Sequence, residues 1–489
     1  MRRPARSTNC IAKRTVWFAL RVPLLAVLGI LSLSSFGLAQ QPAVVAPSKK
    51  TSASPQAIVV IADESVVEHL PGEEPPTQWV ESGEVVVPSA SCYPISSKLT
   101  VDYDDGFLLR PIDKSRTPFE LKLNFHNQFR YTGFARDQPG YINAAGDPIP
   151  IENRNDFGVN RGRIVFSGFA IDPDLSYYIN IDYNTVTGEN ISILTAWFGY
   201  RFSDALRLSF GLGKVPGTWE WLESSRYTLG AERSMATTFF RPSFTAGVWA
   251  DGRLPGNVRY RAMVGDGFNT RSLSETEIDT SLLFSEMVWW EPLGDFGIGF
   301  SDLERHQRPV IRVGEAFTYA PNDAGPFGEP GPEQTVIRLS DGTPIVAEGA
   351  LAPGVTVNSF NIALCSLHAG LKYRGFSLDG EYFLRWLTQI DGNGALPVSS
   401  LFDQGFMAQT GLFVLPKVEL YAIGSFVTGD FGSGSQVTGG ANWYVRGTRN
   451  WRVTFDATAL DTSPAQQART GYQAGATGPL IRAQVWILF

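Results

Sequence analysis

Residues 119–131 read FELKLNFHNQFRY, and this stretch decides the fold class. Apolar side chains fall on one face of the predicted strand and polar side chains on the other, with one break in the apolar series at Asn127. The alternation holds over 13 residues, whereas a usual strand has about 5 or 6. A strand that crosses a hydrocarbon layer at a tilt of about 45° needs about 9 to 11 residues. The stretch is therefore long enough to span a membrane.

The same two-residue period recurs along the chain, and its polar faces carry charged residues. Charged faces suit a water-filled lumen better than a protein core. The repeats lie at 177–183, 206–212, 258–264, 376–386 and 451–458. According to this two-residue period, seven arginines lie on the inward faces, namely Arg163, Arg207, Arg259, Arg261, Arg385, Arg452 and Arg482.

Short and long connections alternate between these strands. Such alternation places every second turn on the same side, which is the layout of an outer-membrane barrel with tight periplasmic turns and longer external loops. The short connections lie at 171–176, 202–206, 253–257, 373–376, 415–417 and 446–450. The long ones lie at about 132–157, 184–190, 214–242, 265–278, 320–358, 389–404, 428–436 and 461–472.

Counting strands under this alternation gives about 16, an even number as bacterial single-chain barrels require. Residues 291–309 are predicted to be an irregular periplasmic connection, although they could instead contain one more strand. The sequence therefore predicts an all-β fold, a transmembrane antiparallel β-barrel over residues 118–489. A secreted β-sandwich, lectin or β-helix would also alternate, but a sandwich seldom needs so many long strands with every second connection short.

Composition agrees with this class. Charged residues make up 18% of the chain, below the soluble average of about 25%. The mean hydropathy of −0.06 argues against a bundle of membrane helices. The net charge of −7 argues against a generic nucleic-acid binder.

The N-terminal region predicts export. A basic stretch from Arg2 to Arg21, an apolar run over 22–33 and small residues up to Ala39 have the pattern of a secretory signal peptide over residues 1–39. A retained anchor helix is the alternative, but its apolar run is short for a bilayer. Residues 40–117 are rich in Pro, Val, Ser and Glu without a lasting period, which predicts a disordered periplasmic leader. The expected location is the cell outer membrane.

The last residues, RAQVWILF, predict a final strand that places Arg482 and Gln484 toward the lumen. We expect this strand to close the barrel against the one that starts near Phe119, because closure leaves no free edge. A terminal Phe489 resembles the C-terminal signal by which bacterial barrels are recognised for insertion. The barrel assembly machinery and outer-membrane lipid are therefore the expected partners.

One region resembles a known family. The motifs are GLGKVP (211–216), SSR (224–226), ERSMA (232–236), RPSFTAGVWADG (241–252) and YRAMVGDGFN (260–269). In order and spacing they resemble the phosphate-selective porin O and P family of bacterial outer-membrane channels. The resemblance implies a homotrimer of 16-stranded porins whose third external loop, residues 214–242 here, folds into the lumen. It also implies passive diffusion of small hydrophilic solutes, with a preference for anions such as phosphate.

The predicted constriction loop contains bases and acids in two possible roles. The bases could pair with the acids to brace the loop, or they could face the path and attract anions. The wall arginines could equally form a solvated face without solute preference. Of the four lysines that follow Phe119, only Lys214 lies in the loop. The charged residues of the loop are Lys214, Arg226, Arg233 and Arg241, with Glu220, Glu223 and Glu232.

The sequence contains no constellation that demands catalysis. The four histidines are dispersed, no Cys or His pair has metal-ligand spacing, and neither GxSxG nor a P-loop occurs. We therefore predict no catalytic residue, metal or cofactor. Two alternatives to an open porin remain. One is a barrel plugged by the loop at 320–358, with a structural or surface-interaction role. The other is an outer-membrane enzyme.

Overall fold

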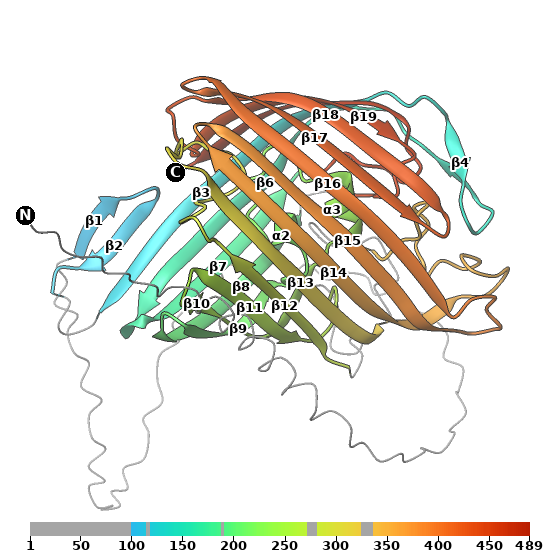
Figure 1. The fold of residues 1–489 in the computed structure, drawn as a ribbon, viewed down its shortest axis with the longest axis horizontal. Coiled ribbons are helices and arrows are strands. Elements are labelled where there is room, and N and C mark those ends of the chain that lie inside the picture. Colours follow the sequence, from blue (N-terminus) through green and yellow to red (C-terminus); the bar gives the residue numbers. More distant parts are fainter. Residues whose placement is uncertain (1–98, 114–117, 187–189, 271–280, 324–335) are drawn as a thin grey trace, which may run out of the picture. The chain divides into compact units, whose positions relative to one another are not determined.

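The computed structural model describes residues 99–113, 118–186, 190–270, 281–323 and 336–489. Sixteen long strands, each antiparallel to its neighbours, close into a barrel (Figure 1). This confirms the predicted fold class and strand number. The barrel strands are β3 (Phe119–Phe134), β6 (Arg154–Ala170), β7 (Asp172–Asn184), β8 (Asn190–Ser203), β9 (Leu206–Lys214), β10 (Phe244–Leu254), β11 (Val258–Gly265), β12 (Leu283–Trp290), β13 (Val310–Asp323), β14 (Val357–Tyr373), β15 (Phe376–Gly392), β16 (Ser400–Leu415), β17 (Val418–Gly429), β18 (Gly432–Tyr444), β19 (Trp451–Asp461) and β20 (Gly478–Leu488).

The barrel closes between β3 and β20. Their register runs from Phe134 opposite Leu480 to His126 opposite Leu488. Beyond the strand, the Phe489 N–H donates to the Phe125 carbonyl at 3.0 Å, and the two rings stack with centroids 5.6 Å apart. As predicted, the last strand thus satisfies the edge of the first, so that lipid meets no unpaired backbone along this seam.

Alternation along the strands separates the two surfaces of the barrel. On β3, His126, Gln128 and Arg130 are buried inside, whereas Phe129 is exposed on the outside. Exposed rings and aliphatic side chains recur on the outer face of the other strands, as a lipid-facing band requires. Within the described residues, no helix is both long enough and apolar enough to cross a membrane.

Two connections bear on the predicted layout. Residues 291–309 join β12 to β13 without a regular strand, as predicted. The long loop expected at 428–436 is instead a tight turn, with Gly429 opposite Gly432. The glycine- and serine-rich sequence there resembles a loop, but its backbone continues the ladder between β17 and β18.

A small hairpin precedes the barrel. Its strands are β1 (Leu99–Tyr103) and β2 (Phe107–Pro111), and β2 pairs with residues 121–123 of β3. This part of β3 extends past the end of β20, so β2 covers an edge that would otherwise be open. The hairpin lies within residues 40–117, for which the sequence predicts a leader without strands, because five-residue strands are too short for the two-residue period to stand out. The signal peptide and the leader up to residue 98 lie outside the described residues.

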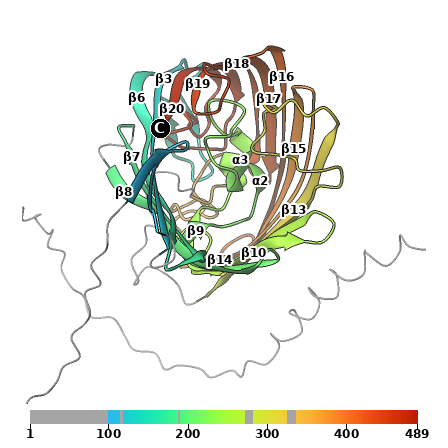
Figure 2. The same ribbon diagram turned by 90° about the vertical axis from the view of Figure 1, so that its left-hand side faces the viewer.

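Loops fill much of the lumen. Two short helices of the third loop, α2 (Trp219–Leu222) and α3 (Met235–Phe240), lie inside the ring of strands (Figure 2). The apolar side of α3 belongs to one large buried cluster. Two other connections, β13–β14 and β19–β20, contribute to the same cluster with Ile337, Leu339, Ile345, Ala465, Tyr472 and Ala476. The first external loop carries the remaining hairpin, β4 (Gly140–Ile142) and β5 (Pro148–Pro150).

Candidate functional site

The third loop is held in the lumen by buried hydrogen bonds at both of its helices. Glu381 on β15 accepts the backbone N–H of Glu220 at 3.0 Å and also that of Trp219. Glu220 in turn accepts the Ser234 hydroxyl at 2.8 Å, and Ser234 caps α3 by accepting the Thr237 N–H at 3.1 Å. Burial raises the pKa of the Glu220 carboxyl, although hydrogen bonds from Thr237 and Ser234 oppose the rise. The loop therefore has a fixed path.

Polar side chains on the barrel wall attach the middle of the loop. Glu232 forms ion pairs with Arg130 on β3 and Arg161 on β6, and all three side chains are almost fully buried. From β19 and β18, on the other side of the seam strand β20, Arg452 donates to the Thr228 carbonyl at 2.7 Å and Asn442 donates to the Leu229 carbonyl at 2.8 Å. These contacts reach the loop from strands far apart in sequence.

Two basic residues of the loop, Lys214 and Arg233, bind its own backbone. The Lys214 ammonium donates to the carbonyls of Trp221, at 2.7 Å, and Glu223, at 2.9 Å. Arg233 donates to the carbonyls of Glu220, at 3.0 Å, and Glu223, at 2.9 Å. Lys214, Arg233 and Arg241 all lie over the Trp221 ring, between 4.4 and 4.9 Å from its centroid. These three positive charges therefore lie close together, around the Trp221 ring.

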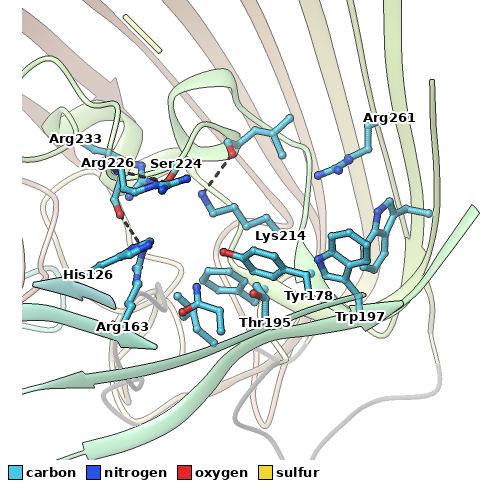
Figure 3. Close-up of a pocket in the computed structure, with 17 residues that line it drawn as sticks. His126, Arg163, Tyr178, Thr195, Trp197, Lys214, Ser224, Arg226, Arg233 and Arg261 are labelled. Atoms are coloured by element: carbon cyan, nitrogen blue, oxygen red, sulfur yellow. Dashed lines mark hydrogen bonds between the residues drawn. The ribbon is translucent and has the colours of Figure 1, made fainter. Parts of the chain in front are cut away.

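A cavity of about 240 Å³ opens beside this cluster, between the loop and β3 to β11 (Figure 3). Arg163, Lys214, Arg226, Arg233 and Arg261 line it, and none of its lining residues carries a carboxylate. A second cavity, of about 280 Å³, shares His126, Tyr178 and Arg226 with the first. It continues to the hairpin tip at Asp105 and to Asn450 in the β18–β19 turn. The two cavities thus adjoin at these three shared residues.

The sequence named eleven basic residues for the path, and five of them line the first cavity. The other six lie elsewhere, most of them against carboxylates of neighbouring strands or turns. Arg241 contacts Trp221, Arg452 binds the loop backbone, Arg207 bonds Asp251 at 2.8 Å, Arg259 lies 3.7 Å from Glu291, Arg385 bonds Asp403 at 2.7 Å and Arg482 bonds Asp456 at 2.7 Å.

Several residues that line the first cavity were not predicted from the sequence to be site residues. Tyr178 lies on the inward face of the strand predicted at 177–183, and the two-residue period of that strand could have identified it as a lumen residue. Trp197 lies in β8, whose sequence ISILTAWFGYRF is apolar on both faces and hides the period. His126 lies on the polar face of β3 and lines both cavities. Among the described residues, no group of three or more His, Cys, Asp or Glu is placed to hold a metal ion.

Comparisons with known proteins agree with the barrel. Residues 120–273 match the family model of phosphate-selective porin O and P, which confirms the resemblance. No sequence among the curated proteins matches the chain. The anion-selective porin from Comamonas acidovorans is 11% identical, with 76% of this chain and 100% of that chain covered and a TM-score of 0.50; this likeness shows the shared fold. OmpF of Salmonella typhi, in a complex with daunomycin, is 11% identical, with 80% and 100% covered and a TM-score of 0.48.

Proposed function

We propose that this chain passes small hydrophilic solutes by diffusion and prefers anions. The proposal builds on the barrel and the family match, which show an outer-membrane porin. The family match and the fold indicate a channel rather than an enzyme. The composition of the first cavity supports this anion preference. Five cationic side chains line the cavity, and no lining residue carries a carboxylate.

Partial neutralisation makes this preference a mild one. Arg163 pairs with Asp182 at 3.0 Å, and Arg261 lies 3.4 Å from Asp251. Lys214 and Arg233 bond backbone carbonyls of the loop, and Arg233 also interacts electrostatically with the buried Glu220 carboxylate. Arg226 is paired with no carboxylate among the described residues, so its positive charge remains at the cavity, and walls of low dielectric strengthen its field.

The test is the reversal potential of the purified, folded protein in a planar bilayer under a salt gradient. Arg226→Gln should move the reversal potential toward cation selectivity. Arg374→Gln, in the exposed β14–β15 turn and outside the lining of both cavities, is the matched control and should leave it unchanged. An Arg226→Gln variant with unaltered selectivity would contradict the assignment.

A homotrimer is the assembly that we propose, and it rests on the family resemblance. We also propose that Phe489 is read by the barrel assembly machinery. Its backbone pairing and ring stacking with Phe125 at the seam support a role in closing the barrel. Residues 1–39 remain our proposed signal peptide, and residues 40–98 remain a proposed periplasmic leader.

A second candidate function is a barrel whose conductance is limited by a plug. The observation in its favour is that Ile337, Leu339 and Ile345 are buried in the same apolar cluster as residues of α3. Exchanging Leu339 and Ile345 for Ser would weaken this packing. A large rise in single-channel conductance would support the plug, and unchanged conductance in a folded variant would oppose it.

A further inference from the structure

We propose that the first cavity is a binding site for small aromatic monocarboxylates, which distinguishes it from a site for inorganic phosphate. The inference rests on the proposed anion preference and adds a substrate class to it. Three features carry it: the aromatic part of the wall, the hydrogen bonds already made by most of the cations, and the position of Arg226 and His126.

The part of the wall away from Arg226 and His126 is aromatic. Tyr178 and Trp197 stack with centroids 5.8 Å apart and ring planes 14° apart, and Trp249 meets Trp197 edge to face at 6.0 Å. Phe244 and Leu194 are buried beside them on the same lining. An apolar cavity of about 150 Å³ is enough to hold benzene. The cavity of about 240 Å³ therefore has room for one ring and its carboxylate.

Most of the cations already direct hydrogen bonds to protein acceptors. Lys214 and Arg233 bond loop carbonyls, and Arg163 bonds Asp182 and the Ser225 hydroxyl. A compact, strongly hydrated anion such as phosphate needs several converging donors to replace its water. These cations attract an anion by their charge but offer few such donors. A monocarboxylate, which has fewer acceptor oxygens, makes a smaller demand.

Arg226 and His126 provide the polar end of the site. Among the described residues, no carboxylate pairs with Arg226, and its guanidinium lies 4.9 Å from the Tyr227 ring centroid. His126 is 5% exposed, and neither of its ring nitrogens has a hydrogen-bond partner among the described residues. Both side chains line both cavities. A guanidinium binds a carboxylate through two parallel hydrogen bonds, and the buried imidazole can donate a further one.

The positions of these side chains would orient a bound aromatic carboxylate in the cavity. Figure 3 shows Arg226 and His126 at one end of the cavity and Trp197 and Arg261 at the other, with Tyr178 between them. A carboxylate at Arg226 would thus place its ring toward Tyr178 and the tryptophans. Burial of the ring and contact with aromatic side chains would favour benzoate over acetate, which carries the same charge.

Bilayer recordings of the full folded protein can test this with benzoate as the probe. Benzoate added to a chloride solution should reduce chloride conductance saturably, whereas acetate and inorganic phosphate at equal ionic strength should not. Trp197→Leu and Tyr178→Leu should each weaken the apparent benzoate affinity about three- to tenfold and keep the anion preference. Arg226→Gln should weaken benzoate binding and reduce the anion preference, and Arg374→Gln should change neither.

The outcomes separate the inference from the proposed function. A cation-selective reversal potential would overturn the proposed function. An anion-selective channel on which benzoate and acetate act alike would overturn only the aromatic carboxylate site. Unchanged benzoate affinity in both folded aromatic variants would overturn it as well.

Discussion

Arg161 on β6 and Glu232 on the inserted loop form an ion pair whose side chains are each 1% exposed, with Nη2 and Oε2 2.9 Å apart. Arg130 on β3 also pairs with Glu232, through the Oε1 atom that Arg161 contacts as well. A loop held only by apolar packing could shift within the lumen, whereas this group fixes the position of residue 232 on the wall. The next residue, Arg233, lines the first cavity.

Glu232→Gln should destabilise the folded barrel and loosen the third loop. The substitution leaves Arg130 and Arg161 buried without their carboxylate, and breaking a buried pair in this way costs about 3–5 kcal/mol. We expect a lower temperature for loss of the heat-modifiable form and noisier single-channel currents. Glu223→Gln is the control, because that carboxylate accepts the neighbouring Ser224 N–H on the same loop. Equal melting temperatures for Glu232→Gln and the wild type would contradict this role.

Asp105→Asn should increase the anion preference. Asp105 belongs to the β1–β2 hairpin tip, accepts a hydrogen bond from Asn450 at 2.6 Å and lines the second cavity. Its negative charge therefore opposes anions where the path reaches the hairpin, and the asparagine keeps a hydrogen-bond acceptor there. The reversal potential should shift slightly toward anions. An unchanged reversal potential would show that the path does not pass Asp105.

Acid should release the connection at 291–309 from the β18–β19 turn. Burial acts to raise the pKa of Glu304, but hydrogen bonds and charge from Arg449 lower it below its ordinary value. A lowered pKa means that the pair stabilises the fold above that ordinary value and that this contribution is lost as the pH falls through the lowered pKa. The pair is partly exposed, so its contribution is at most about 1 kcal/mol.

Melting temperatures measured from neutral pH to below pH 4 can check this pair. Glu304→Gln should melt lower than the wild type at neutral pH, and the two curves should converge in acid. A constant difference at every pH would show that Glu304 acts through packing rather than through charge.

Deletion of Phe489 should impair barrel assembly, because it removes the backbone pairing with Phe125 and the stacked ring at the seam. Phe489→Leu keeps the backbone and removes the ring, so it separates the two effects. The readout is the heat-modifiable fraction in isolated outer membranes. A normal folded fraction after the deletion would count against this role.

The sequence predicted the barrel well because a membrane wall imposes a two-residue period that single strands reveal. FELKLNFHNQFRY becomes most of β3, and the predicted loop at 214–242 is the one that enters the lumen. The β1–β2 hairpin could not be found in this way, because its strands are short and depend on the free edge of β3.

The site was harder to predict. The two-residue period of a strand assigns each side chain to the inner or the outer face, but it does not identify the residue that the side chain contacts. Arg163, Arg385 and Arg482 all point inward, yet each lies directly opposite an aspartate of the neighbouring strand. Those partners, Asp182, Asp403 and Asp456, follow from the register between strands, which the sequence of one strand does not contain. The register is thus what decides which cations pair with a neighbouring carboxylate.

The most direct test of the account is the zero-current potential of the wild-type protein in a planar bilayer under a KCl gradient. A cavity lined by Arg163, Lys214, Arg226, Arg233 and Arg261 without a carboxylate predicts a potential on the chloride-selective side, reduced by Arg226→Gln. A potassium-selective potential in the wild type would contradict it.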